Sequence, residues 1–342
     1  MTIRIGLIGS GNISETHVRA AREISGVEVA AVYGRNSDRV ASLCQRYGGR
    51  PFQEFDQFLA HRPMDLVVIG TPSGLHATQG IEAARRGLHV LTEKPMDIST
   101  ERADALIQAT EKAGVKLGII FQDRLKPDIL RLREMIRGGQ LGKVLLVDAR
   151  VKWYRPPEYY SGSGWRGTFS LDGGGALINQ GVHTVDLLLW LLGDVKSLQA
   201  RSRTSLHAIE VEDTCATILE FAGGPLCTLQ ATTAAYPGFP RRVEITGSEG
   251  TVVLEDDRIV LAQLKKSAGD LVHSASVNDE GASSHVVSDL GGHRAILVDF
   301  IRAIETNGTP ACNGQEGRRS IALIESIYRA SRDLECVYTT TA

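Results

Sequence analysis

The sequence predicts a two-domain protein. The first domain is α/β with a doubly wound parallel sheet, and the second is α+β with a large open, mostly antiparallel sheet. Over the first 120 residues, short β-rich runs alternate with segments of helical periodicity, which is typical of a parallel sheet covered on both faces. Beyond residue 121, several strands follow one another without helices between them, which favours antiparallel pairing. The 342 residues fit two domains, expected at residues 1–121 and 122–342.

Apolar runs and helical spacing define the elements of the first domain. Strands are expected at residues 3–8, 27–32, 66–69, 89–91 and 116–120. Helices are expected at residues 14–24, 38–47, 75–86 and 100–113. Runs such as "DLVVIG" are nearly continuous in apolar residues, so these strands are expected to be buried on both faces.

The second domain begins with a predicted helix at 128–137, which ends at two glycines. Strands are expected at 143–154, 198–205, 214–221, 227–234, 242–246, 251–255 and 258–264. A strongly apolar helix is predicted at 176–192, and two more helices at 293–306 and 315–332. The polar, Gly- and Ser-rich segment 265–292 is predicted to be a mobile loop.

Composition excludes several classes of partner. The net charge of -2, with acids and bases mixed along the chain, gives no reason to expect nucleic acid or an anionic membrane surface. No apolar run is long enough to span a bilayer, and the N-terminus lacks a signal-peptide layout. Five scattered cysteines without a CxxC pair argue against a disulfide framework and against a metal site, so we expect a cytoplasmic protein without metal.

"GLIGSGNIS", residues 6–14, follows a predicted strand and opens a predicted helix. Gly9 and Gly11 permit a tight turn there, and the backbone of Asn12 and Ile13 begins the helix, as in a dinucleotide-binding fingerprint. The alternative is a glycine turn in another α/β fold. A carboxylate that would bond a ribose 2′-hydroxyl is missing after the second strand, where Arg35 stands instead. This favours NADP slightly over NAD, although Arg35 stacking on the adenine would suit either cofactor.

Two further motifs follow consecutive strands and therefore face the same crevice. In "GTPSGLH", Thr71 and Pro72 form a rigid turn before His76, which alone would equally suit a surface or capping histidine. In "LTEKPMD", Pro95 restricts the backbone of Lys94, so the ammonium is aimed at the crevice. There it would hold a substrate hydroxyl and favour a developing alkoxide. The alternative is a solvated Glu93–Lys94 charge pair in a loop.

The helix in "DGGGALINQGVHTVDLLLWLLG", residues 172–193, carries Asn179 and His183 four residues apart, and so on one face. A histidine in such an apolar helix is commonly a core residue, but a neutral imidazole also suits a general base. The preceding loop, "KWYRPPEYYSGSGWRG", is rich in aromatic and basic residues that suit sugar rings, among them Tyr154, Trp165 and Arg166; a packed aromatic loop is the alternative. Gln122 and Arg124 lie at the domain boundary and are expected to reach the cleft.

In this order, the motifs resemble the glucose-fructose oxidoreductase, inositol dehydrogenase and rhizopine catabolism (Gfo/Idh/MocA) family over nearly the whole chain. "EKP" and the Asn179-x-x-x-His183 helix are the most specific elements. The resemblance implies a Rossmann domain followed by an open-faced sheet domain that pairs with another subunit as a homodimer or homotetramer. Residues implied to line the cofactor are Arg35, Thr71, His76, Glu93 and Gln122, and the Trp165–Arg166 pair resembles one near the nicotinamide or substrate.

The same resemblance implies that Lys94 orients the substrate hydroxyl and that His183 is the acid/base. The family often has an aspartate where this chain has Asn179, so His183 and Lys94 would carry more of the proton transfer. We therefore expect an NAD(P)-dependent oxidoreductase acting on a secondary hydroxyl of a sugar, cyclitol or sugar derivative. The alternatives are a redox-assisted hydrolase or lyase that retains NAD, and a binding protein that senses cofactor or sugar without turnover.

Overall fold

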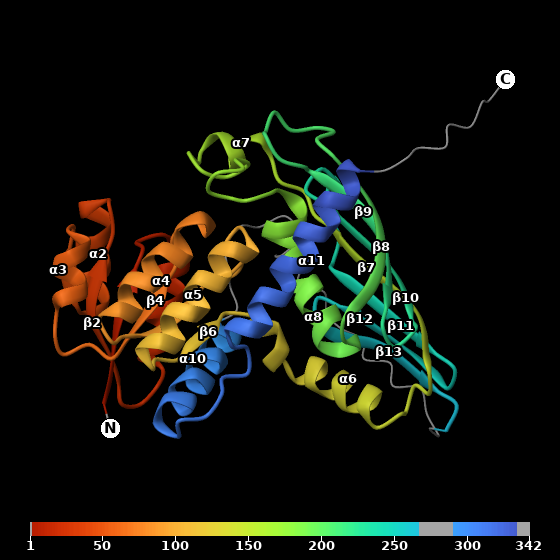
Figure 1. Ribbon diagram of the computed structural model, residues 1–342, viewed down its shortest axis with the longest axis horizontal. Coiled ribbons are helices and arrows are strands. Elements are labelled where there is room, and N and C mark those ends of the chain that lie inside the picture. The colour runs from red at the N-terminus through yellow and green to blue at the C-terminus, as the bar shows by residue number, and fades with distance from the viewer. Residues whose placement is uncertain (1, 267–289, 334–342) are drawn as a thin grey trace.

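The computed structural model describes residues 2–266 and 290–333, and it has two sheets side by side (Figure 1). Sheet A has the strand order β3-β2-β1-β4-β5-β6 and every neighbouring pair is parallel. Its strands are β1 (Ile3–Ile8), β2 (Val27–Tyr33), β3 (Arg50–Phe52), β4 (Leu66–Ile69), β5 (His89–Thr92) and β6 (Leu117–Ile119). The expected parallel, doubly wound first sheet is confirmed.

Helices cover both faces of sheet A. They are α1 (Asn12–Arg22), α2 (Ser37–Tyr47), α3 (Phe55–Ala60), α4 (His76–Arg85) and α5 (Thr100–Ala113), joined by α10 (Leu290–Glu305) from late in the chain. One apolar cluster joins α1, α2 and α10 to the sheet, and a second joins α3, α4 and α5 to its other face. The sequence prediction missed β3 and α3, because neither is long enough to show a clear hydrophobic period.

Sheet B has the order β13-β12-β11-β7-β10-β9-β8. Its strands are β7 (Val144–Lys152), β8 (Val195–Arg203), β9 (Thr214–Phe221), β10 (Leu226–Thr232), β11 (Arg242–Gly247), β12 (Gly250–Glu255) and β13 (Arg258–Leu264). All neighbours are antiparallel except β7 and β10. After β7 the chain leaves the sheet and returns at its far edge, so the β9–β10 hairpin brings β10 beside β7 in the same direction. The mostly antiparallel sheet that we expected is confirmed.

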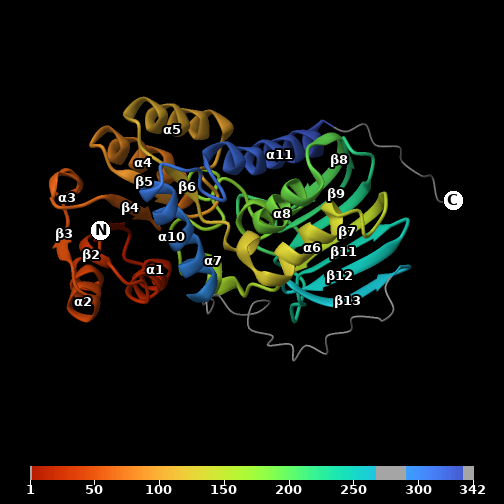
Figure 2. The ribbon, with the colours of Figure 1, turned by 90° about the horizontal axis from the view of Figure 1, so that it is seen from below.

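The helices of this half lie on one face of sheet B, and the other face carries no helix from the described part of the chain (Figure 2). They are α6 (Pro127–Arg137), α8 (Val182–Leu192) and α11 (Gly314–Arg332), while the short α7 (Pro157–Ser161) lies in the aromatic loop. The open face has a polar hollow lined by alternate residues of the central strands, including Asp148, Arg150, Gln230 and Glu244.

The last helices tie the two halves together. Phe300 of α10 is buried against sheet A, although α10 follows the whole of sheet B in the chain. α11 lies between the halves and contacts α5, β6, α8 and β8. A division at residue 121 therefore does not describe the packing of α10. The predicted loop at 265–292 lies almost wholly outside the described residues.

No described helix is long and apolar enough to cross a membrane. Cys44, Cys215, Cys227 and Cys312 are free thiols.

Candidate active site

The glycine turn after β1 leaves room for a ligand beside a helix N-terminus. Gly9 has φ +121°, and a Cβ there would lie 2.7 Å from the carbonyl oxygen of Gly70, so the turn requires glycine. A Cβ at Gly11 would meet nothing within 4 Å. Because Gly11 gives α1 no side-chain cap, the first N–H groups, those of Asn12 and Ile13 included, can bind an anion. These features fit the pyrophosphate of a dinucleotide.

The residues after β2 are open to a ribose phosphate. Arg35 is exposed, and Asn36 uses its side chain to cap α2, accepting from the backbone N–H of Arg39 at 3.0 Å. Gly34 is required by crowding, because a Cβ there would lie 2.7 Å from Ser10 Oγ. The exposed Arg35 side chain is thus available to a ligand.

The loop after β4 is braced from within. The buried His76 places Nε2 2.8 Å from the carbonyl oxygen of Thr71 and Nδ1 2.8 Å from that of Pro95. Both ring nitrogens contact the backbone, so His76 links the loops that follow β4 and β5. The hydroxyl of Thr71 donates to Gln79 Oε1 at 2.6 Å, which holds the turn before Pro72.

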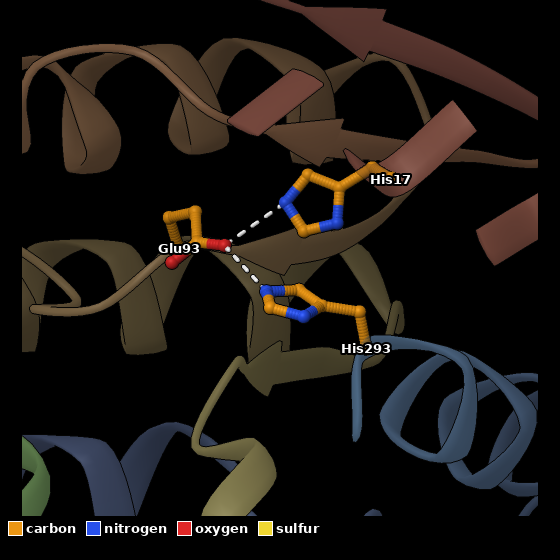
Figure 3. Close-up of side chains that lie close together, drawn as sticks. All are labelled: His17, Glu93 and His293. Atoms are coloured by element: carbon orange, nitrogen blue, oxygen red, sulfur yellow. Dashed lines mark ion pairs between the residues drawn. The ribbon is translucent and has the colours of Figure 1, made fainter. Parts of the chain in front are cut away.

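Glu93 lies in a buried pocket between two histidines (Figure 3). Its Oε1 is 2.9 Å from His17 Nε2 on α1 and 3.7 Å from His293 Nε2 on α10. Burial would raise the pKa of Glu93, but contacts from both imidazoles outweigh it and hold the pKa well below its ordinary value. The carboxylate thus joins two helices behind the crevice, and the cofactor contact expected of Glu93 has no support in these contacts. Potential metal ligands of the three residues lie within 4.8 Å of one another.

Lys94 follows directly and reaches across to the second half of the chain. Its backbone N–H donates to Glu93 Oε2 at 3.2 Å, and its Nζ donates to the backbone oxygen of Asn179 at 2.9 Å. Burial lowers the pKa of Lys94, while the carboxylates of Glu93, Asp172 and Asp123 oppose that shift. A lysine with a depressed pKa and two unused ammonium protons suits contact with a substrate oxygen.

The helix that carries Asn179 begins as a π-helical segment, η3 (Ala176–Gly181), and continues as α8. Its first N–H groups are bound by Glu212, which accepts from Gly175 at 2.8 Å and from Leu177 at 2.9 Å. The wider π turn modifies the single α-helical face that we expected for Asn179 and His183, and such segments are frequent at functional sites. The side chain of Asn179 contacts Asp172, and that of His183 lies beside Asp123.

His183 lies in the interior beside Asp123. Its Nδ1 is 3.4 Å from Asp123 Oδ2, and its ring meets Phe121 edge-on with centroids 5.8 Å apart. Burial, with the charges of Lys94 and Arg241, lowers the pKa of His183 to about 3, against the opposing effect of Asp123. The imidazole is therefore neutral near pH 7. A proton on Nδ1, facing the carboxylate, leaves Nε2 as the basic nitrogen.

Asp123 is held as an anion by a cluster of opposite charges. Arg241 is 2.8 Å from its Oδ2, and Lys126 is 2.9 Å from its Oδ1. Asp257 contacts the same two cations. Burial would raise the pKa of Asp123, but Arg241, His183 and Lys126 hold it well below its ordinary value.

Asn179 is fixed by a second carboxylate. Its Nδ2 donates to Asp172 Oδ1 at 2.6 Å, and Asp172 Oδ2 accepts from the backbone of Gly167 at 2.9 Å. Burial raises the pKa of Asp172 to about 6, against the opposing effects of these two donors, Lys94 and Arg166. Lys94, Asn179 and Asp172 thus form one connected chain of contacts.

Arg124 is a correction to the sequence prediction, which placed it in the cleft. Its side chain is 1% exposed and pairs with Asp186 through Nη2 at 2.6 Å and with Glu316 through Nη1 at 2.9 Å. These contacts join η2 (Gln122–Leu125) to α8 and α11, so Arg124 connects the two halves and does not face a substrate. The neighbouring Gln122 keeps a buried Oε1 without a hydrogen-bond partner among the described residues.

The aromatic loop divides between two places. The Arg166 guanidinium lies 4.2 Å from the ring centroid of Tyr159 and 5.4 Å from that of Trp165, on the Asp172 side. Tyr159 accepts from Gln180, next to Asn179, at 3.2 Å. Tyr154 instead packs edge-on against the exposed Tyr236, with centroids 5.2 Å apart. No contact among the described residues joins Tyr154 to Lys94 or His183.

Sequence reasoning missed three residues of this site: Asp123, Asp172 and Arg241. Asp123 stands between the two residues of "FQDRLKP" that were considered, and Asp172 opens the glycine-rich approach to η3. Their positions at the end of a strand and at the start of a helix were visible signals. Arg241 lies just before β11 and gave no signal in the sequence.

Comparison with known proteins agrees with this architecture. The model of an oxidoreductase family with an NAD-binding Rossmann fold matches residues 3–121, and that of the GFO/IDH/MocA C-terminal domain matches residues 129–253. The crystal structure of the WlbA dehydrogenase from Bordetella pertussis, in complex with NADH and UDP-GlcNAcA, is 32% identical with a TM-score of 0.87, and the match covers 97% of each chain.

Two characterised relatives match at lower identity. Inositol 2-dehydrogenase of Rhizobium meliloti is 26% identical over 96% of this chain and 97% of its own. The 1,5-anhydro-D-fructose reductase of Ensifer adhaerens is 28% identical over 96% of both chains. With both family models matched in order and a full-length relative above 30% identity, this chain belongs to the Gfo/Idh/MocA family of NAD-binding oxidoreductases.

Proposed function

We propose that the protein transfers a hydride between a nicotinamide dinucleotide and a secondary hydroxyl or keto carbon of a sugar, cyclitol or sugar derivative. The observation that carries this proposal is the contact of Lys94 Nζ with Asn179 O, one turn before His183. It brings an ammonium and a neutral imidazole to the same end of sheet A, beside the glycine turn. The relatives named for inositol and anhydrofructose, and the WlbA dehydrogenase crystallised with UDP-GlcNAcA, support a polyhydroxylated substrate.

When bound, the dinucleotide supplies the hydride acceptor. In the direction of oxidation, Lys94 donates a hydrogen bond to the substrate oxygen and favours negative charge on it. His183 accepts the hydroxyl proton at Nε2 while the C–H hydrogen leaves as hydride, which forms the carbonyl. Asp123 orients the imidazole and stabilises the imidazolium that results. Reduction reverses each step.

For the cofactor, we propose that Gly9, Gly11, Asn12 and Ile13 hold the pyrophosphate and that Arg35 contacts the adenosine end. Because Gly34, Arg35 and Asn36 follow β2, where a carboxylate would repel a 2′-phosphate, NADP is slightly preferred over NAD. The relative that was crystallised with NADH supports NAD instead.

For the substrate, we propose contacts from Asn179, Trp165 and Arg166, with Gln122 and Thr71–Pro72 closing the nicotinamide end of the crevice. Tyr154 lies farther out and belongs to this set only if a partner subunit or a long substrate reaches it. We also propose that the open face of sheet B pairs with that of a second copy in a homodimer or homotetramer, which its hollow of paired opposite charges supports.

A titration of NADPH and NADH by fluorescence, followed by turnover assays on polyols, sugars and sugar acids, tests the proposal. We expect binding of both cofactors and net reduction or oxidation with at least one substrate. Turnover without net change of a retained cofactor would identify a redox-assisted hydrolase or lyase instead. Cofactor binding with no hydride transfer across the panel would indicate a sensing protein.

A further inference from the structure

A buried carboxylate lies beside Asn179 in the site. Asn179 stands where the family often has an aspartate, and an amide carries no charge. Asp172, seven residues earlier, is 2% exposed and places Oδ1 2.6 Å from Asn179 Nδ2. A negative charge is therefore present beside position 179, although it belongs to another residue.

The contacts of Asp172 differ from those of a structural ion pair. Within the described residues, its hydrogen-bond donors are the Asn179 amide and the Gly167 backbone, both neutral, and no cation lies within ion-pair distance. The charged groups that face it are Lys94, at the end of β5, and Arg166, in the aromatic loop; Tyr159 and Tyr160 are its nearby phenols. Burial without a paired cation raises the pKa of Asp172 to about 6, within the working range of an enzyme.

Asn179 connects the carboxylate of Asp172 to Lys94. Its Nδ2 is used by Asp172, so its Oδ1 is turned away as an acceptor and lies 3.3 Å from Gln180 Nε2. Its backbone oxygen accepts from Lys94 Nζ at 2.9 Å. The side chain and the main chain of one residue therefore connect the carboxylate to the ammonium, and the negative charge favours the protonated form of Lys94.

We propose that Asp172 is a positioning residue of the hydride-transfer site. It holds the Asn179 amide in one orientation, and its negative charge adds to those of Glu93 and Asp123 in keeping Lys94 as an ammonium facing the substrate oxygen. This inference rests on the proposed function, because it gives Asp172 its role through Lys94. The negative charge that the family often has at position 179 is thus supplied in this chain by Asp172.

The test compares Asp172→Asn, Asn179→Asp and the double variant, with Asp128→Asn as control. Asp128 is half-buried and, like Asp172, accepts a backbone N–H, from Ile259 at 2.9 Å, but it lies between α6 and β13. We expect Asp172→Asn to lower kcat by roughly tenfold or more and to abolish a kcat inflection near pH 6, with NADH affinity unchanged. The double variant, which moves the carboxylate to position 179, should regain most of the lost kcat, and the control should match the parent.

A second measurement does not need turnover. Acetic anhydride labelling of Lys94 in the protein without cofactor, followed by peptide mass spectrometry, reports the fraction of unprotonated amine. Without the nearby charge, Asp172→Asn should be labelled about tenfold faster at pH 7.5, and Asp128→Asn at the parental rate. This readout separates the inference from the proposed function, whose failure would appear as no hydride transfer by the parent protein.

Two results would overturn the inference. One is an Asp172→Asn protein with parental kcat, parental pH profile and parental labelling. The other is a loss of kcat without change in pH profile or labelling and without recovery in the double variant, because this indicates a packing role only. If Asp172→Asn does not fold, Asp172→Glu replaces it: the longer carboxylate keeps the charge, so labelling near the parental rate supports the inference and tenfold faster labelling contradicts it.

Discussion

Lys94 Nζ donates a hydrogen bond to the main-chain oxygen of Asn179 at 2.9 Å, across 85 positions of sequence. The contact joins the end of β5 in sheet A to the π-helical start of the helix that carries His183. A main-chain acceptor imposes no charge of its own, so the ammonium is held in place while two of its protons stay available to a ligand. Five predictions follow from this arrangement and from the charges around it.

Replacing the two central residues should remove turnover and leave the cofactor bound. We expect Lys94→Ala and His183→Ala each to lower kcat by about 10² or more, because each removes a group that handles the substrate oxygen or its proton. NADH affinity, measured by fluorescence, should change little. Lys196→Ala is the control, since Lys196 pairs on the surface with Glu220. A variant of either residue with near-normal kcat on a proven substrate would refute that residue's role.

Replacing Asp123 should lower kcat more than replacing the neighbouring Asp257 does. Asp123→Asn removes the charge that orients His183 and stabilises its protonated form, so we expect kcat to fall by roughly 10² or more with a smaller effect on KM. Asp257→Asn is the matched control, because Asp257 contacts Arg241 and Lys126 without contacting His183. Equal losses of kcat in both variants would show that only the stability of the charge cluster matters.

Arg35 should determine selectivity between the two nicotinamide cofactors. Arg35→Asp introduces a carboxylate where a 2′-phosphate would lie, so we expect the ratio of NADPH to NADH affinity to fall by about tenfold or more. Arg39→Asp makes the same charge change at an exposed site four residues later, in α2, and should alter the ratio little. An unchanged ratio in Arg35→Asp would remove Arg35 from the cofactor site.

Arg124 should contribute to stability and not to substrate binding. Arg124→Met leaves Asp186 buried without its cation, and breaking such a pair typically costs about 3–5 kcal/mol. We expect a lower free energy of unfolding in urea and a nearly normal KM for the folded fraction. The double variant Arg124→Met, Asp186→Leu should recover part of the loss. A single variant that is stable but has a raised KM would instead support the substrate contact that the sequence predicted for Arg124.

His183 should make the protein more stable at neutral pH than in acid. Its folded-state pKa of about 3 lies below its ordinary 6.5, so the unfolded chain binds the proton first as pH falls. Its contribution is complete above pH 6.5 and is lost as pH falls toward 3, with a total on the order of 5 kcal/mol. His183→Gln should flatten the dependence of urea unfolding on pH over that interval. If the stability of His183→Gln varied with pH in the same way as that of the parent protein, this would contradict the depressed pKa of His183.

The prediction from sequence succeeded where a local pattern has one structural solution. The apolar strand runs, the caps and the glycine turn gave both sheets and most helices within a few residues. It failed where an element is short, as at β3 and α3, or where the partner is remote. Nothing local to 290–305 says that α10 returns to sheet A, because its apolar stripe would fit any complementary face.

The site divides in the same way. By itself, the sequence determined the chemical groups and the strand ends that present them: Gly9, Lys94 and His183 were each identified from a motif and its context. Only the tertiary structure decided which charges surround them. Asp123 is held as an anion by Arg241, which is more than a hundred residues away. Arg124 pairs with Asp186 instead of reaching the cleft. Electrostatic partners depend on distances in space and on burial, and a linear pattern of residues specifies neither.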